Sequence, residues 1–169
     1  MNSLNTKEIA KCGLMAALVF IFTYTFKIPS PNGYTHLGDA FILIAVLVLG
    51  RQKGAFAGGI GAALADFAGG YAVWILPTFI IKFIMAYVMG LFTEKILSSS
   101  SWGYIVGSVI GGIIQIALYT LVKIPLFGIS YAIVRLPGLT IQTICGIVIA
   151  VIIVGVLDKS HVLKFVKEM

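Results

Sequence analysis

Residues 62–87 read AALADFAGGYAVWILPTFIIKFIMAY and place one acid and one base in two otherwise apolar segments. Asp66 lies near the end of the first segment, and Lys82 lies near the beginning of the second. A short glycine-rich turn with the aromatic residues Tyr71 and Trp74 joins them. An ionised side chain inside a membrane is costly and usually marks a pathway, a ligand site or a pair of opposite charges. We therefore take this helical hairpin as the centre of the fold and of the site.

The composition of the whole chain indicates a membrane protein. Of its 169 residues, 60% are hydrophobic and only 11% are charged. An ordinary soluble domain is about 45–50% apolar and about 25% charged, so a lipid bilayer must surround this chain. We expect one domain over residues 1–169. The first apolar run lacks a small-residue cleavage site, so we expect a retained helix and not a signal peptide.

The apolar segments predict an all-α, polytopic bundle of six transmembrane helices. Their approximate ranges are 8–27, 39–50, 54–69, 76–96, 103–123 and 136–157. Turn-forming residues follow the first segment, and a loop around Pro125 and Pro137 is expected to join the last two. The second segment is short for a span, so tilt or its neighbours must supply the missing length.

Lysine and arginine residues are divided unevenly between the two sides of such a bundle. The side with both termini holds Lys7, Lys11, Arg51, Lys53, Lys95, Lys159, Lys164 and Lys167, and the other side holds Lys27, Lys123 and Arg135. Because cytoplasmic loops carry the positive excess, we expect a multi-pass cell-membrane protein with both termini in the cytoplasm. This bias accounts for the net charge of +6, and without a basic face interleaved with aromatic residues no nucleic-acid partner is expected.

Polar side chains concentrate in the outer half of the predicted bundle. With a rise of about 1.5 Å per residue, Asp66 and Lys82 sit at similar depths, roughly 5–8 Å below the outer helix ends. The predicted substrate-binding residues are Tyr34, His36, Asp39, Asp66, Tyr71, Trp74, Lys82, Gln115, Tyr119 and Gln142. A polar cluster on one side only is typical of a cup open to the outside and not of a pore.

All of these residues except Tyr119 also have a purely structural interpretation, and so does the nearby Tyr131. Asp66 and Lys82 could form a pair that locks two helices, and Asp39 could cap its helix. His36 could be an exposed loop residue, and Gln115 and Gln142 could form interhelical hydrogen bonds. The remaining role is interfacial anchoring, by Tyr34, Tyr71, Trp74 and Tyr131. The convergence of all these groups on one side of the membrane favours a ligand site.

The sequence carries no clear signature of catalysis or of a metal or cofactor site. It lacks a serine–histidine–aspartate arrangement, a metal-ligand spacing and a glycine-rich phosphate loop. Cys12 and Cys145 lie far apart and are expected to be packing residues. We therefore expect neither an enzyme nor a metalloprotein, and any uphill transport must be driven by ions or by another subunit.

Small residues recur four positions apart in several segments. Rows of this kind let helix backbones approach closely in lipid, where no hydrophobic effect drives helices together. The rows are Gly54, Gly58 and Ala62 with Gly61 and Ala65 beside them, then Gly103, Gly107 and Gly111, and a short row in the first helix, Gly13 and Ala17 with Ala16 adjacent. The rows of the third and fifth helices are expected to serve packing within the chain.

Several short patterns resemble the substrate-binding S components of energy-coupling factor (ECF) transporters. They are HLGDA at 36–40, LGR at 49–51 before a glycine- and alanine-rich helix, ALAD at 63–66 followed by Gly70-Tyr71, and Ile81-Lys82. The resemblance covers nearly the whole chain and is closest to the branch assigned to pyridoxine or hydroxymethylpyrimidine, a thiamine precursor.

The resemblance implies a six-helix subunit that captures a small water-soluble vitamin or precursor outside the cell, with a bacterial source expected. Such subunits dock on a transmembrane scaffold (T) subunit and two cytoplasmic ATPase (A) subunits, which power uptake. The family's first helix carries an Ala-x-x-x-Ala row that meets the scaffold. Here Gly13 and Ala17 are the nearest match, with glycine in place of the first alanine, and the expected docking residues are Gly13, Ala16 and Ala17.

The sequence leaves three further functions open. The chain could serve another vitamin such as pantothenate or riboflavin, or act alone as an ion-coupled carrier, which uptake without an ATPase would reveal. An integral-membrane enzyme is the third possibility, which substrate turnover by the pure protein would reveal.

The topology predicts which loops face the outside of the cell. In a background with Cys12→Ser and Cys145→Ser, we expect Ser30→Cys to react with an impermeant maleimide in intact cells. Ser99→Cys should react only after permeabilisation, because the positive excess holds its side in the cytoplasm. Labelling of position 99 but not of position 30 would reverse the orientation.

Overall fold

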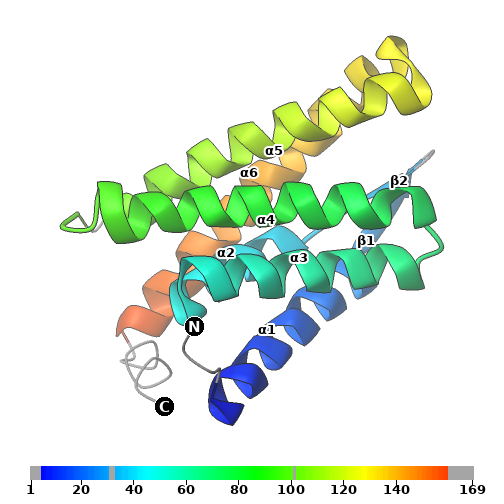
Figure 1. The fold of residues 1–169 in the computed structure, drawn as a ribbon. Helices are drawn as coiled ribbons and strands as arrows, with labels where there is room; N and C mark the ends of the chain where they lie inside the picture. The colour runs from blue at the N-terminus through cyan, green and yellow to red at the C-terminus, as the bar shows by residue number, and fades with distance from the viewer. Residues whose placement is uncertain (1–4, 31–32, 101, 160–169) are drawn as a thin grey trace.

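The computed structural model describes residues 5–30, 33–100 and 102–159 (Figure 1). In chain order the elements are α1 (Thr6–Thr25), β1 (Lys27–Ser30), β2 (Gly33–His36), α2 (Gly38–Leu49), α3 (Arg51–Ala68), the 3-10 turn η1 (Ala72–Trp74), α4 (Ile75–Leu91), the π-helical turn η2 (Phe92–Ile96), α5 (Gly103–Phe127) and α6 (Ile129–Lys159). The described residues thus form a helical bundle with one small antiparallel hairpin, in which Lys27 pairs with His36 and Ser30 pairs with Gly33.

Four stretches of the described chain are long and apolar enough to cross a membrane: Thr6–Thr25, Ala72–Ile96, Gly103–Phe127 and Ile129–Leu157. The short helix α2 is apolar but has only 12 residues. It packs against α1, α3, α4 and α6, and most of its side chains are buried. Because protein surrounds α2, it does not need the length of a helix that meets lipid directly.

Glycines in α3 and α5 bring helix backbones into direct contact. A Cβ atom on Gly61 would lie 2.4 Å from the carbonyl oxygen of Ala16 in α1, and one on Gly111 would lie 2.6 Å from that of Met85 in α4. No side chain fits at such distances, so these helices can pack this closely only where glycine stands. The predicted packing role of the α3 and α5 rows is confirmed.

The connections differ from the sequence expectations in two places. The loop after the first helix contains a short β-hairpin, while the described chain is otherwise helical, in agreement with the predicted all-α class. Pro125 and Pro137, expected in a loop, lie inside α5 and α6, which are separated by Gly128 alone. Proline is tolerated within membrane helices because neighbouring groups satisfy the freed carbonyl. Gly128 makes the reversal instead, with a φ of 87° that glycine adopts without steric cost.

The connections of the bundle fall at two ends. Figure 1 shows the start of α1, the end of α6 and the α4–α5 connection at one end, and the hairpin, the α3–α4 turn and the α5–α6 connection at the other. We call the second of these the hairpin end. The orientation prediction requires this grouping, while the side of the membrane on which each end lies remains a prediction.

The glycine contacts predict opposite effects for two similar substitutions. Gly111→Ala should lower the free energy of unfolding by about 1–3 kcal/mol, because its new methyl group meets the α4 backbone. Gly155→Ala in α6 should be neutral or raise it by about 0.5–1 kcal/mol, because no described atom lies within 4 Å and alanine favours the helix. Unfolding of the purified protein in micelles by a denaturing detergent measures both. Equal effects would refute the close contact of α4 with α5.

Candidate ligand-binding site

A cavity opens at the hairpin end of the bundle and has a volume of about 580 Å³ including its mouth. The lining residues are Thr23, Tyr34, Thr35, His36, Asp66, Trp74, Thr78, Tyr119, Lys123, Tyr131, Arg135, Leu139 and Gln142. They come from the end of α1, from β2, and from the parts of η1, α3, α4, α5 and α6 that lie near this end. Three chain reversals at one end therefore bring together residues that are far apart in the sequence.

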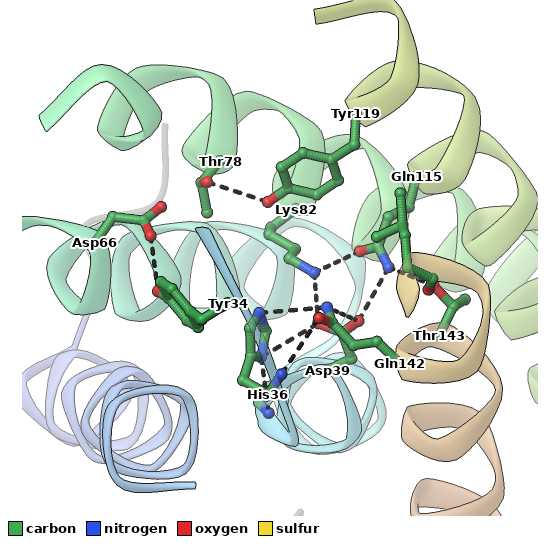
Figure 2. Close-up of polar contacts among 12 residues, drawn as sticks. Tyr34, His36, Asp39, Asp66, Thr78, Lys82, Gln115, Tyr119, Gln142 and Thr143 are labelled. Atoms are coloured by element: carbon green, nitrogen blue, oxygen red, sulfur yellow. Dashed lines mark hydrogen bonds and ion pairs between the residues drawn. The ribbon is translucent and has the colours of Figure 1, made fainter. Parts of the chain in front are cut away.

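An ion pair lies at the centre of a buried polar network below the cavity. The Lys82 ammonium is 2.5 Å from Asp39 Oδ1, and the two side chains are 0% and 2% exposed (Figure 2). Lys82 also donates a hydrogen bond to Gln115 Oε1 at 2.6 Å. Pairing and hydrogen bonding of this kind are what allow two charges to remain inside an apolar bundle.

Amide and hydroxyl groups complete this network. Gln115 Nε2 donates to Asp39 Oδ2 at 2.9 Å and to Thr143 Oγ1 at 2.9 Å. Gln142 Nε2 donates to the same Asp39 oxygen at 3.2 Å. Through these bonds the network connects α2, α4, α5 and α6. The network closes the bottom of the cavity, and its charges and hydrogen-bonding groups are already paired with one another.

His36 attaches the hairpin to this network. Its backbone N–H donates to Gln142 Oε1 at 3.3 Å, and its Nδ1 accepts from the Gly38 N–H at 3.1 Å. Burial lowers the pKa of His36 to about 4, so the imidazole is neutral at pH 7. The hairpin end therefore carries a fixed, uncharged hydrogen-bonding ring on the wall of the cavity.

Asp66 lies on the wall with only one of its oxygens occupied. The Tyr34 hydroxyl donates to Asp66 Oδ1 at 2.7 Å. Burial and the nearby carboxylate raise the pKa of Tyr34 far above its usual value, so the phenol stays protonated as a donor. Asp66 Oδ2 is buried and has no hydrogen-bond partner among the described residues. A buried acceptor without a partner is unfavourable unless a ligand or water satisfies it.

Aromatic rings form another part of the wall. The Trp74 ring centroid lies 5.8 Å from that of Tyr119 and 5.9 Å from that of Phe127. The Tyr119 hydroxyl donates to Thr78 Oγ1 at 3.1 Å, which fixes its ring (Figure 2). These rings offer flat apolar surface to a planar ligand.

The predicted site residues occupy two layers of this structure. Six of them line the cavity: Tyr34, His36, Asp66, Trp74, Tyr119 and Gln142. Asp39, Lys82 and Gln115 lie in the buried network below, and Tyr71 packs against Tyr34 with the ring centroids 4.9 Å apart. Lys82 therefore supports the floor of the cavity and does not line its wall.

The geometry corrects two of the structural interpretations. Asp66 and Lys82 are not the pair: Asp39 is the partner of Lys82, and Tyr34 binds Asp66. Equal depth gave no information on the direction in which each side chain leaves its helix, and that direction decides the pairing. His36 is buried and does not occupy an exposed loop position.

The structural roles considered for Trp74, Asp39 and the two glutamines have mixed outcomes. Trp74 is buried and is not an interfacial anchor. Asp39 lies in the first turn of α2 but makes no capping hydrogen bond, since its carboxylate is turned to Lys82. Gln115 and Gln142 do form interhelical hydrogen bonds, so this role is confirmed for both.

Seven lining residues were not among the sequence candidates. They are Thr23, Thr35, Thr78, Lys123, Tyr131, Arg135 and Leu139. Lys123 could have been found, because it follows Tyr119 by four residues and so shares its helix face. Arg135 could not, because it was assigned to a loop that is in fact part of α6.

The predicted docking residues of α1 lie on two different faces. Gly13 and Ala17 are exposed, and no described atom lies within 4 Å of the position of a Gly13 Cβ. Ala16 instead packs against the core, and its carbonyl oxygen faces Gly61 of α3. Only Gly13 and Ala17 of this row therefore remain available to a partner.

The network predicts which charges depend on each other. Lys82→Met or Asp39→Asn alone should lower the free energy of unfolding by about 3–5 kcal/mol, because each leaves a buried charge without its partner. The double variant should lose much less than the sum of the two. Unfolding in micelles by a denaturing detergent measures this coupling energy.

The matched control is a second double-mutant cycle, which combines Lys82→Met with Asp66→Asn. We expect weaker coupling there, because Lys82 is bound by Asp39 and Asp66 is bound by Tyr34. Stronger coupling of Lys82 with Asp66 than with Asp39 would refute the arrangement of the network.

Comparison with known proteins agrees with this architecture. Residues 3–159 match the family described as "ECF-type riboflavin transporter, S component". An uncharacterised protein of Pyrococcus woesei is 35% identical over 135 residues, which are 79% of this chain and 88% of that protein. The thiamine precursor transporter HmpT of Lactococcus lactis is 26% identical over 167 residues, which are 97% of this chain and 95% of that transporter.

A solved structure, "Structure and mechanism of the S component of a bacterial ECF transporter", shares the fold. The two structures superpose with a TM-score of 0.68 at 22% sequence identity, covering 95% of this chain and 98% of the other. The expected resemblance is therefore confirmed for the family, while the identity of the vitamin is not confirmed. The chain belongs to the family of ECF-type transporter S components.

Proposed function

We propose that this chain is the substrate-binding subunit of an ECF-type transporter and captures a small water-soluble vitamin or vitamin precursor. The observation that carries the proposal is the cavity at the hairpin end, closed below by the Asp39–Lys82 network. Its wall combines flat aromatic surface with a few polar groups, as expected for a small-molecule site. A cavity closed at one end suits capture and not free passage.

The proposed ligand is a single-ring heterocycle of the hydroxymethylpyrimidine or pyridoxine type. Trp74 and Tyr119 would stack on the ring, and Asp66 Oδ2 would accept a hydrogen bond from a ring N–H, amino or hydroxyl group. Similarity to a thiamine precursor transporter over nearly the whole chain supports the pyrimidine. Riboflavin, which appears in the name of the matched family, and pantothenate are the competing ligands.

In the proposed topology all six helices span the membrane, with both termini in the cytoplasm and the hairpin end outside. The basic residues Arg51 and Lys53 at the beginning of α3 contact Glu94 and Glu8, which lie in η2 and in the first turn of α1, at the opposite end from the cavity. Because the positive-inside rule counts lysine and arginine and gives acidic residues little weight, these basic residues support the orientation even where they are paired.

As an ECF S component, the chain would take up its ligand together with a scaffold subunit and two ATPase subunits, and the ATPase would be theirs, since this sequence has no phosphate loop. Gly13 and Ala17 would provide the docking face, since both are exposed on α1. Their small side chains would let a helix of the scaffold approach closely.

One experiment separates binding from docking. Gly13→Trp and Ala17→Trp should leave ligand binding by the isolated protein unchanged but abolish uptake and co-purification with the scaffold, because a bulky side chain blocks close helix approach. Asp66→Asn should do the reverse, with affinity falling about tenfold or more through loss of a charged hydrogen bond. Ile152→Trp on the exposed face of α6 is the control and should change neither.

The readouts are calorimetric binding of hydroxymethylpyrimidine, pyridoxine, riboflavin and pantothenate, and uptake of the ligand that binds. Mass spectrometry of the compound that co-purifies with the protein provides an independent identification. Uptake without partner subunits would favour an ion-coupled carrier. Unchanged transport by the tryptophan variants would place the docking face elsewhere.

A further inference from the structure

Two cations on the cavity wall have no counter-charge among the described residues. Lys123 is 7% exposed, and its ammonium lies 5.3 Å from the Tyr119 ring centroid and 5.9 Å from that of Trp74. Arg135 also lines the cavity, and its buried Nε has no hydrogen-bond partner in the described part of the chain. The ion pairs of the described residues join other groups and include neither side chain.

This arrangement differs from that of Lys82 at the floor. Lys82 is neutralised by Asp39 and hydrogen-bonded by Gln115, so it needs nothing from a ligand. Lys123 and Arg135 instead both line the cavity, as like charges that repel each other. Placing like charges together in a poorly solvated site is unfavourable unless an anion joins them.

The other residues that line the cavity do not neutralise the positive charge of Lys123 and Arg135. Asp66 is the one carboxylate among the described lining residues, and it binds Tyr34. His36 is neutral at pH 7. The lining therefore carries two positive groups beside the aromatic rings and a single negative group on α3.

We propose that the ligand carries an anionic group, a carboxylate or a phosphate, which binds Lys123 and Arg135 while its ring stacks on Trp74 and Tyr119. The ligand would then lie across the cavity, with a hydrogen-bond donor at Asp66 and its anionic substituent at α5 and α6. This inference rests on the proposed function, because it specifies the chemical class of ligand for the same cavity.

Matched probes test the charge requirement. The neutral probes are pyridoxine and hydroxymethylpyrimidine, and the anionic ones are pyridoxic acid, pyridoxine phosphate and hydroxymethylpyrimidine phosphate. We expect wild-type protein in micelles to bind at least one anionic probe about tenfold or more tightly than its neutral parent, as a charge-assisted contact provides. Lys123→Gln and Arg135→Gln should each remove most of this advantage. Lys95→Gln should keep it, because this exposed lysine lies in η2, at the opposite end of the bundle from the cavity (Figure 1).

The outcomes separate the inference from the proposed function. Equal binding of both probe classes, or an advantage that survives Lys123→Gln and Arg135→Gln, overturns the inference and leaves the function standing. An advantage lost equally in Lys95→Gln also overturns it, because bulk charge then explains the preference. If wild-type protein binds no probe, a co-purified compound that is anionic supports the inference and a neutral one overturns it. Absence of any bound compound refutes the function, and the inference falls with it.

A lipid headgroup could supply the same anion. The binding measurements are therefore repeated in nanodiscs of phosphatidylcholine with and without phosphatidylglycerol, and with inorganic phosphate as competitor. Retention of the advantage in both nanodiscs supports a soluble anionic ligand. Loss of the advantage only with phosphatidylglycerol, in a manner that depends on Lys123 and Arg135, assigns the site to lipid headgroups and overturns the proposal.

Discussion

The rest of this bundle depends on the ion pair between Asp39 and Lys82. The pair lies in the interior, where apolar side chains would pack without the cost of removing two charges from water. Each charge by itself would be strongly unfavourable in the interior, and neither side chain can reach water. The pair is stable because Gln115 binds both partners at once. This requirement fixes α2, α4 and α5 relative to one another, and their positions set the depth of the cavity above.

The division between satisfied and unsatisfied polar groups gives the cavity its chemistry. Below, the charges and amides of the network are matched within the protein. On the wall, Asp66 keeps a free oxygen, and Lys123 and Arg135 have no counter-charge in the part of the chain that the structure describes. Buried polar atoms left without partners raise the free energy of the empty site, and a ligand that satisfies them lowers it. The lower layer therefore acts as a rigid support, while the wall is suited to recognition.

Small residues allow such a site to exist in a chain of this size. Contact of α3 with α1 and of α5 with α4 at glycine positions leaves space for α2 within the bundle. A short, mostly buried helix then supplies Asp39 from the centre. The hairpin adds the remaining wall, and His36 holds it in place through Gln142. The exposed face of α1, with Gly13 and Ala17, takes no part in this packing.

The sequence by itself determined the membrane class, the approximate helices and the end of the bundle at which polar groups gather, because composition and the spacing of apolar residues reflect solvent and helix length directly. Six of the ten predicted site residues line the cavity, and for Asp66, Tyr119 and Gln142 the reason is that depth along a helix follows from residue number. Only the tertiary structure decided that Lys82 pairs with Asp39 and not with Asp66, that His36 is buried, and that Lys123 and Arg135 turn inward. These features depend on the rotation of each helix about its axis and on a hairpin and a glycine reversal that residue periodicity does not encode. Side-chain direction is fixed by close contacts between helices, and those contacts form only when the whole chain has folded.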